Sequence, residues 1–198
     1  DQLYGDQRND SLYGGGGDDQ LHGGADEDFL QGDLGDDWLD GGAGNDELRA
    51  GLGDDTLLGG AGNDALFGED GNDVADGEAG EDYLAGGAGN DTLRGGSEDD
   101  ILQGGIGADH LSGDTGNDIL TGGEGDDTLI GGEGTDFLIG GKGNDLLQGG
   151  EGTDFYVFSD DFGQDTIVED ADREALDEIV FSGISTHQLW FEEQGNDL

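Results

Sequence analysis

The clearest chemical feature of this sequence is an aspartate that returns at every ninth position. A frame of nine residues runs from Gly5 to Val157 through seventeen units, and its sixth position is always Asp. These repeat aspartates are Asp10, Asp19, Asp28, Asp37, Asp46, Asp55, Asp64, Asp73, Asp82, Asp91, Asp100, Asp109, Asp118, Asp127, Asp136, Asp145 and Asp154. Carboxylate oxygens are hard ligands, and a flexible set of six or more oxygens suits Ca²⁺ better than Mg²⁺. The spacing therefore predicts a series of calcium sites.

The residue types argue against a zinc site and against a catalytic site. The sequence has no Cys, and His22, His110 and His187 are far apart, which argues against zinc. No nucleophile with a neighbouring base can be recognised, and the regular carboxylates are already assigned to the cation. We therefore expect no catalytic residue and no enzymatic activity in this segment.

The charge of the chain restricts its partners. It has 51 acidic and 5 basic residues and a formal net charge of -46, so nucleic acid and anionic membrane surfaces should be repelled. No apolar run approaches the length of a membrane span, so we expect no membrane insertion by this segment. Stacked carboxylates roughly 5 Å apart would repel by about 3 kcal/mol per pair. We expect a monomer that is a disordered polyanion without Ca²⁺ and folds as the metal binds.

The rest of the nine-residue frame indicates how the aspartates are positioned. Glycine fills the first position except at Ala50, and the fourth except at Arg8, Asp26 and Glu98, which indicates backbone with positive φ or carbonyls that turn toward one point. The eighth position is Leu in all units but two, where it is Ala75 or Tyr156. We predict a six-residue turn followed by a three-residue strand with one inward side chain. Two units, or eighteen residues, then make one coil of a right-handed parallel β-roll, with leucines stacked between two sheets.

The repeated motif GGxGxDxUx, in which U is a large apolar residue, resembles the nonapeptide of RTX (repeats-in-toxin) proteins. The resemblance implies that each Ca²⁺ lies between the loop of one unit and the loop two units later. Its ligands would be turn carbonyls and repeat aspartates, with up to about fifteen ions in the chain. At the fifth position, as at Asn45 and Asp54, we expect the side chain to support the turn. Trp38 and Tyr83, at the seventh position, should pack on the outer surface.

The composition changes after Val157, which suggests a β-roll over residues 1–157 and a truncated capping segment over residues 158–198. Thr166-Ile167-Val168, Ile179-Val180-Phe181 and Leu189-Trp190-Phe191 read as strands, and a cap would protect the open end of the roll. The segment is also similar to the region after the repeats in RTX cytolysins, most of all the adenylate cyclase toxin family. Both ends look cut, so we interpret the chain as part of a larger secreted protein.

The resemblance leads to one main functional hypothesis and two alternatives. The main one is a calcium-dependent folding and secretion module of an RTX toxin, a bacterial protein that passes unfolded through a type I secretion machinery and folds outside the cell. The first alternative is a structural stalk of an RTX adhesin or surface-layer protein. The second is a repeat module of a secreted polysaccharide-modifying enzyme.

Overall fold

A computed structural model describes residues 1–159, 163–168 and 177–182 of the chain. These residues form twenty strands in two sheets of ten, and the fold class is all-β, as predicted. None of the described segments forms a helix with the length and apolar character that a membrane span requires.

The odd-numbered strands form the first sheet: β1 Gln2–Gln7, β3 Gln20–Ala25, β5 Trp38–Ala43, β7 Thr56–Ala61, β9 Val74–Ala79, β11 Thr92–Ser97, β13 His110–Thr115, β15 Thr128–Gly134, β17 Leu146–Gly152 and β19 Thr166–Val168. The even-numbered strands form the second: β2 Ser11–Gly16, β4 Phe29–Leu34, β6 Glu47–Leu52, β8 Ala65–Asp70, β10 Tyr83–Ala88, β12 Ile101–Ile106, β14 Ile119–Glu124, β16 Phe137–Lys142, β18 Phe155–Phe158 and β20 Glu178–Phe181.

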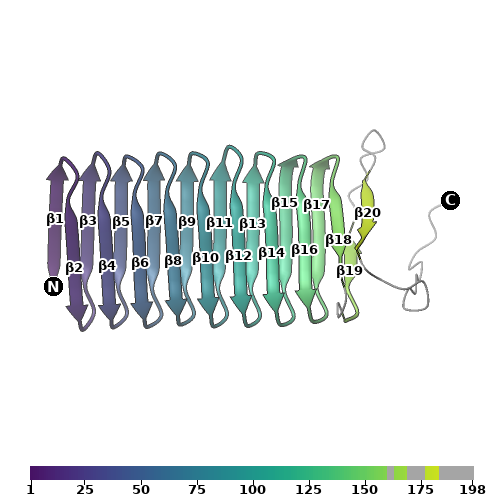
Figure 1. Ribbon diagram of the computed structural model, residues 1–198, viewed down its shortest axis with the longest axis horizontal. Helices are drawn as coiled ribbons and strands as arrows, with labels where there is room; N and C mark the ends of the chain where they lie inside the picture. The colour runs from purple at the N-terminus through teal and green to yellow at the C-terminus, as the bar shows by residue number, and fades with distance from the viewer. Residues whose placement is uncertain (160–162, 169–176, 183–198) are drawn as a thin grey trace.

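The chain alternates between the two sheets, and successive coils are 18 residues apart. Leu39 in β5 is in register with Leu57 in β7, and Leu84 in β10 with Leu102 in β12. Every pairing between described strands is parallel. The strands lie across the long axis of the solenoid, and in the regular coils those of one sheet point in the opposite direction to those of the other (Figure 1). The predicted β-roll, with two units in each coil, is therefore confirmed.

The strands are longer than we predicted from the sequence. A typical strand has six residues and joins the last three positions of one unit to the first three of the next, as in Trp38–Ala43. The glycines at the first and second positions are therefore paired backbone, and Gly42 is in register with Gly60. Only three residues, such as Gly44, Asn45 and Asp46, remain for most turns, and two remain after β15 and β17. The expected six-residue turn was wrong because glycine alone does not distinguish a turn from a crowded strand.

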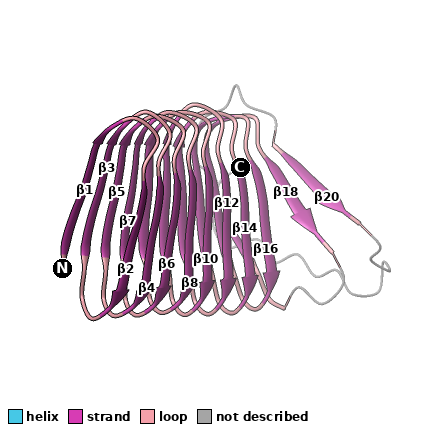
Figure 2. Cartoon of the chain, turned by 60° about the vertical axis from the view of Figure 1, so that its left-hand side comes forward, coloured by secondary structure: helices cyan, strands magenta, loops and turns pink. Residues whose placement is uncertain are grey.

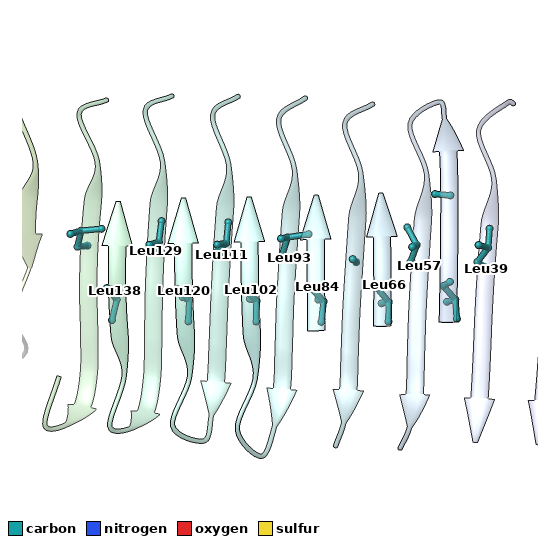
Figure 3. Close-up of a cluster of buried hydrophobic side chains, with 14 of the residues drawn as sticks. Leu39, Leu57, Leu66, Leu84, Leu93, Leu102, Leu111, Leu120, Leu129 and Leu138 are labelled. Carbon is teal, nitrogen blue, oxygen red and sulfur yellow. The ribbon is translucent and has the colours of Figure 1, made fainter. Parts of the chain in front are cut away.

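Leucines from the two sheets meet between them and form one continuous core (Figure 3). The core residues at the eighth position are almost fully buried from Leu21 to Tyr156, and the small Ala75 occupies one of these places. In the last regular unit the Tyr156 hydroxyl accepts a hydrogen bond from the Gly149 N–H at 2.7 Å. The thin core thus fixes which face of each strand points inward, and with it the direction of the turns.

Two strands of the C-terminal segment extend the roll. The predicted strands at Thr166 and Ile179 are present as β19 and β20, which pair in parallel with β17 and β18. Ile167 packs against the leucine core, whereas Ile179 keeps 43% of its surface exposed. The predicted strand Leu189-Trp190-Phe191 lies outside the described residues, and the assignment of a cap over residues 158–198 stays a prediction.

Candidate metal centre

The turns between strands lie along the two edges of the roll (Figure 2). Each regular turn contains one repeat aspartate, so these residues form two columns, one along each edge. Each of them closes a turn, of three residues in most units and of two at Asp136 and Asp154, and precedes a strand: Asp46 precedes β6, and Asp55 precedes β7. Since successive turns lie on opposite edges, aspartates of every second unit share a column. The repeat aspartates from Asp19 to Asp154 expose at most 4% of their surface, and Asp10 in the first coil is partly buried. The fold therefore buries a row of acidic side chains at each edge.

Hydrogen bonds connect the aspartates of a column into a ladder. The backbone N–H of Asp46 donates to Oδ1 of Asp64 at 2.7 Å, and the N–H of Asp64 donates to Oδ1 of Asp82 at 2.7 Å. The same contact recurs along both columns, with lengths up to 3.0 Å. From Asp28 onward, one oxygen of each repeat carboxylate therefore accepts a hydrogen bond from the turn of the preceding coil, and the other oxygen takes no part in the ladder.

The second oxygen has no hydrogen-bond donor. Oδ2 of all seventeen repeat aspartates is buried without a partner, and Oδ2 of Asp165 is in the same position. A buried carboxylate oxygen without a donor costs free energy that a protein normally avoids, because water can no longer solvate its charge. The regular recurrence of this cost marks each of these oxygens as a position for a positive charge.

Burial also makes these carboxyl groups hard to ionise. Desolvation is the main cause of raised pKa values in both columns, and the neighbouring carboxylates of the same column add to it. It raises the pKa of Asp100 to about 8, and those of Asp73, Asp127 and Asp136 to about 7. The backbone hydrogen bond of the ladder lowers the pKa of each group but does not compensate for burial. A bound cation would remove this penalty because it favours the charged form.

Glycine at the first position keeps space open beside the unpaired oxygen. A Cβ atom placed on Gly59 would lie 2.7 Å from Oδ2 of Asp64 and 2.9 Å from the carbonyl oxygen of Gly77 in the next coil. Both neighbours are oxygens with negative partial or formal charge, so a cation fits between them better than a methyl group does. Carboxylate and backbone carbonyl oxygens are also the donor set that Ca²⁺ prefers. The residues present therefore fit the predicted metal.

The side chains at the fifth position have a different role, as we expected. The Asn63 N–H donates to Oδ1 of Asn45 at 3.0 Å, and the Asn72 N–H donates to Oδ1 of Asp54 at 2.8 Å. This second ladder runs along the exposed side of the turns and points in the direction opposite to the buried one. These side chains hold neighbouring turns together.

Three units carry a side chain in place of the fourth-position glycine. Arg8, Asp26 and Glu98 have φ values of 83°, 75° and 78°, so their backbone stays in the left-handed region that glycine occupies elsewhere. The turn is preserved at the cost of some backbone strain. The Gly80 N–H donates to Oε2 of Glu98 at 3.1 Å, which gives that side chain a structural contact.

Trp38, Tyr83 and His22 lie on the outer faces of the sheets, whereas Tyr156 and Phe158 belong to the core. Trp38 contacts His22 at a ring distance of 4.7 Å, and the Tyr83 hydroxyl donates to Gln103 at 3.1 Å, so the predicted surface packing is confirmed. Within the described residues, no three His, Asp or Glu side chains gather into a conventional metal cluster. A cation at the edges would therefore need backbone carbonyls as well as the paired carboxylates.

Sequence reasoning missed two aspartates that continue the columns. The Asp145 N–H donates to Oδ1 of Asp165 and the Asp154 N–H donates to Oδ1 of Asp177, both at 3.0 Å. Their spacings are 20 and 23 residues, so they fall outside the frame of nine. Both could have been recognised as an Asp directly before a short strand rich in β-branched residues, as in Asp165-Thr166-Ile167.

Comparison with known sequences agrees with this geometry. The model for the RTX calcium-binding nonapeptide repeat matches residues 1–30, 22–57, 31–66, 58–93, 94–129 and 130–167. A search of curated proteins finds no match. The matched stretches together extend from the first residue to beyond the last regular unit, and they contain every repeat aspartate. The chain therefore belongs to the family of RTX calcium-binding nonapeptide repeats, which are calcium-binding modules of type I-secreted proteins.

Proposed function

We propose that this chain is the calcium-triggered folding module of a protein that leaves the cell unfolded through a type I secretion machinery. The repeat aspartates are its metal ligands, together with turn carbonyls of the same and the neighbouring coil. The observation that carries the proposal is the buried, unpartnered Oδ2 atom of every repeat aspartate. Bound Ca²⁺ would supply the positive charge that these atoms lack.

The electrostatics explain why folding would wait for calcium. In the metal-free roll each column is a row of buried, mutually repelling carboxylates in a chain with a net charge of -46. The unfolded chain avoids this cost because its carboxylates are solvated. Low calcium inside the cell would therefore keep the chain unfolded for export, and millimolar calcium outside would fold it.

The number of ions follows from the ladder. If each ion is shared by units two apart, the seventeen regular units provide up to about fifteen sites, and the Asp145–Asp165 and Asp154–Asp177 pairs would add two more. Fifteen divalent ions would add thirty positive charges and change the formal balance from -46 to -16. The folded module would remain strongly acidic and soluble, and mutual repulsion favours a monomer.

A toxin of the cytolysin kind is the parent protein that we propose. The support is the sequence after the repeats, where Gly163-Gln164-Asp165-Thr166-Ile167 is similar to the corresponding region of RTX cytolysins. A stalk is the second candidate, and the uninterrupted rod of parallel coils favours it because a rigid rod can act as a spacer (Figure 1).

Calcium titration followed by circular dichroism tests the folding proposal. We expect a cooperative change from coil to β-structure, because each site is shared and neither half is stable alone. Mg²⁺ at the same concentration should not produce it, since it does not accept a large flexible oxygen set. Isothermal calorimetry should find about fifteen ions per chain. A full β-spectrum in excess chelator, or an equal response to Mg²⁺, would refute the proposal.

A further inference from the structure

The outer face of the second sheet carries a continuous row of apolar side chains. Tyr83, Ile101, Ile119, Phe137 and Phe155 occupy the seventh position of successive coils and are in register across β10, β12, β14, β16 and β18. Ile101, Ile119 and Phe137 expose 44%, 40% and 41% of their surface, and the rings of Phe137 and Phe155 stack at 4.6 Å. We call this row the apolar stripe.

The outward positions beside the apolar stripe contain no charged residue. The parallel row at the ninth position consists of Ala85, Gln103, Thr121, Ile139 and Val157, and the second position is glycine in β10, β12, β14 and β16. On the first sheet, β9, β11 and β13 instead carry Asp76, Glu78, Arg94 and Asp114 on the outer face. A chain with a net charge of -46 thus keeps the middle of one face uncharged in its C-terminal half. Such a patch on a soluble protein marks an interaction surface.

The turns that border the stripe are acidic. Glu81 and Asp99 stand exposed just before β10 and β12, and Asp126 stands exposed just after β14. The cation at this border, Lys142 at the end of β16, is paired with Glu124. With the net charge of the whole molecule, the acidic side chains attract cationic partners and repel anionic ones. Charge complementarity therefore selects a positively charged partner with an apolar face, and it disfavours both an anionic membrane and a second copy of this chain.

The position of the stripe in the sheet selects the conformation of that partner. The strands β10 to β16 are paired on both sides, so no free strand edge is available for an added strand. A partner on this face has to satisfy its own backbone hydrogen bonds, which an α-helix does. Five strands spaced about 4.8 Å apart give a stripe about 19 Å long, which matches roughly 13 residues of helix. The geometry points to the apolar stripe as a docking site for a cationic amphipathic helix.

Fluorescence anisotropy with two labelled synthetic peptides tests this assignment. One peptide places Leu and Lys at helical spacing so that the leucines form a single face, and the other has the same composition in scrambled order. In excess Ca²⁺ and at physiological ionic strength, which screens nonspecific attraction, the amphipathic peptide should bind at least tenfold more tightly. Equal binding of the two peptides would show that only the net charge acts, and would overturn the proposal.

A matched pair of variants locates the binding face. Ile101, Ile119 and Phe137 are replaced together by Thr, which other units carry at the seventh position, as at Thr92. The control replaces Val74 and Leu146 by Thr. These two residues occupy the seventh position of the repeat in strands of the first sheet, and they expose 47% and 40% of their surface. The first variant should lose the preference for the amphipathic peptide and the control should keep it. If the triple variant lacks the β-spectrum, the single variant Ile119→Thr is used in its place. If a folded variant of the apolar stripe still binds the amphipathic peptide more tightly than the scrambled one, to the same degree as the unchanged chain, the assignment is refuted.

Discussion

The backbone N–H of Asp145 donates a hydrogen bond to Oδ1 of Asp165, although 20 residues separate them instead of the usual 18. Oδ2 of Asp165 is buried without a partner, and burial raises the pKa of Asp165 to about 6. Asp165 therefore has the environment of a repeat aspartate, even though it lies after the last regular unit. The edge column continues past the repeats into the C-terminal segment.

This relationship predicts a metal-binding role for Asp165. Asp165→Asn should raise the calcium concentration needed for folding, because it removes a negative charge from a buried site shared with Asp145. The control is Asp126→Asn, at an exposed fifth position where Asn is common and where the side chain accepts hydrogen bonds from the backbone N–H and the side-chain amide of Asn144. Calcium titration by circular dichroism should show a clear shift for the first variant and almost none for the second. Equal midpoints would contradict the assignment.

The raised pKa values predict that acid partly replaces calcium. In the metal-free roll Asp46, Asp73 and Asp100 have pKa values raised to about 6, 7 and 8, so they keep their protons well above pH 4, where the same groups lose them in the unfolded chain. The folded state binds more protons in this window, so its stability falls as the pH rises and increases as the pH falls. In excess chelator, the β-signal should be stronger at about pH 5 than at about pH 8. An unchanged or weaker signal at the lower pH would contradict this.

The unit at residues 68–76 should be the weakest part of the roll. Ala75 lies in register between Leu57 and Leu93, so the core lacks an isobutyl group at this level. Such a loss costs about 2 to 5 kcal/mol in a packed core. Glu69 in the same unit also has a φ of 75°, in a region that glycine occupies more readily. Hydrogen exchange in calcium should show faster exchange at residues 68–76 than at residues 122–139.

A pair of variants separates the core defect from the other features of that unit. Ala75→Leu should slow exchange at residues 68–76, because the eighth position is Leu in the neighbouring coils. Leu93→Ala, one coil further along the same sheet, should create a second weak point of similar size. Equal protection of residues 68–76 and 122–139 in the unchanged chain would show that the defect is compensated.

The regular part of the fold and its candidate ligands could be predicted because every unit repeats the same arrangement of an aspartate in the turn and an inward side chain in the strand. Asp64 and Leu66 repeat the roles of Asp46 and Leu48, so one correct unit predicts all seventeen. The strand length could not be predicted from the glycines. Gly59 lies in a paired strand, and it is glycine because the Asp64 carboxylate lies against it. The sequence alone shows only that a glycine is present. Asp165 and Asp177 were missed because insertions change the spacing while the hydrogen bonds persist.

The last prediction concerns the C-terminal segment as the nucleus of folding. In a one-dimensional array the first coil is costly, and each later coil needs only one more unit and its ions. β19 and β20 pair with β17 and β18, and they bring Asp165 and Asp177 to the ends of the two columns. Phe158 and Phe181 also stack at 5.7 Å beside them. The stack of the buried Phe158 with Phe181 thus adds to the strand pairing and the aspartate ladder that the coils in the middle of the roll also have.

Deletion of residues 158–198 should therefore raise the calcium midpoint or abolish the transition, although every repeat aspartate remains. The second variant, Trp190→Ala with Phe191→Ala, tests the aromatic residues outside the described part of the chain without shortening it. The control deletes residues 1–18, which removes one coil with β1 and β2 from the other end. It should leave the midpoint almost unchanged, because the remaining coils still fold from the C-terminal end. If the two deletions shift the midpoint equally, the repeats nucleate by themselves and the C-terminal segment only shields an open edge.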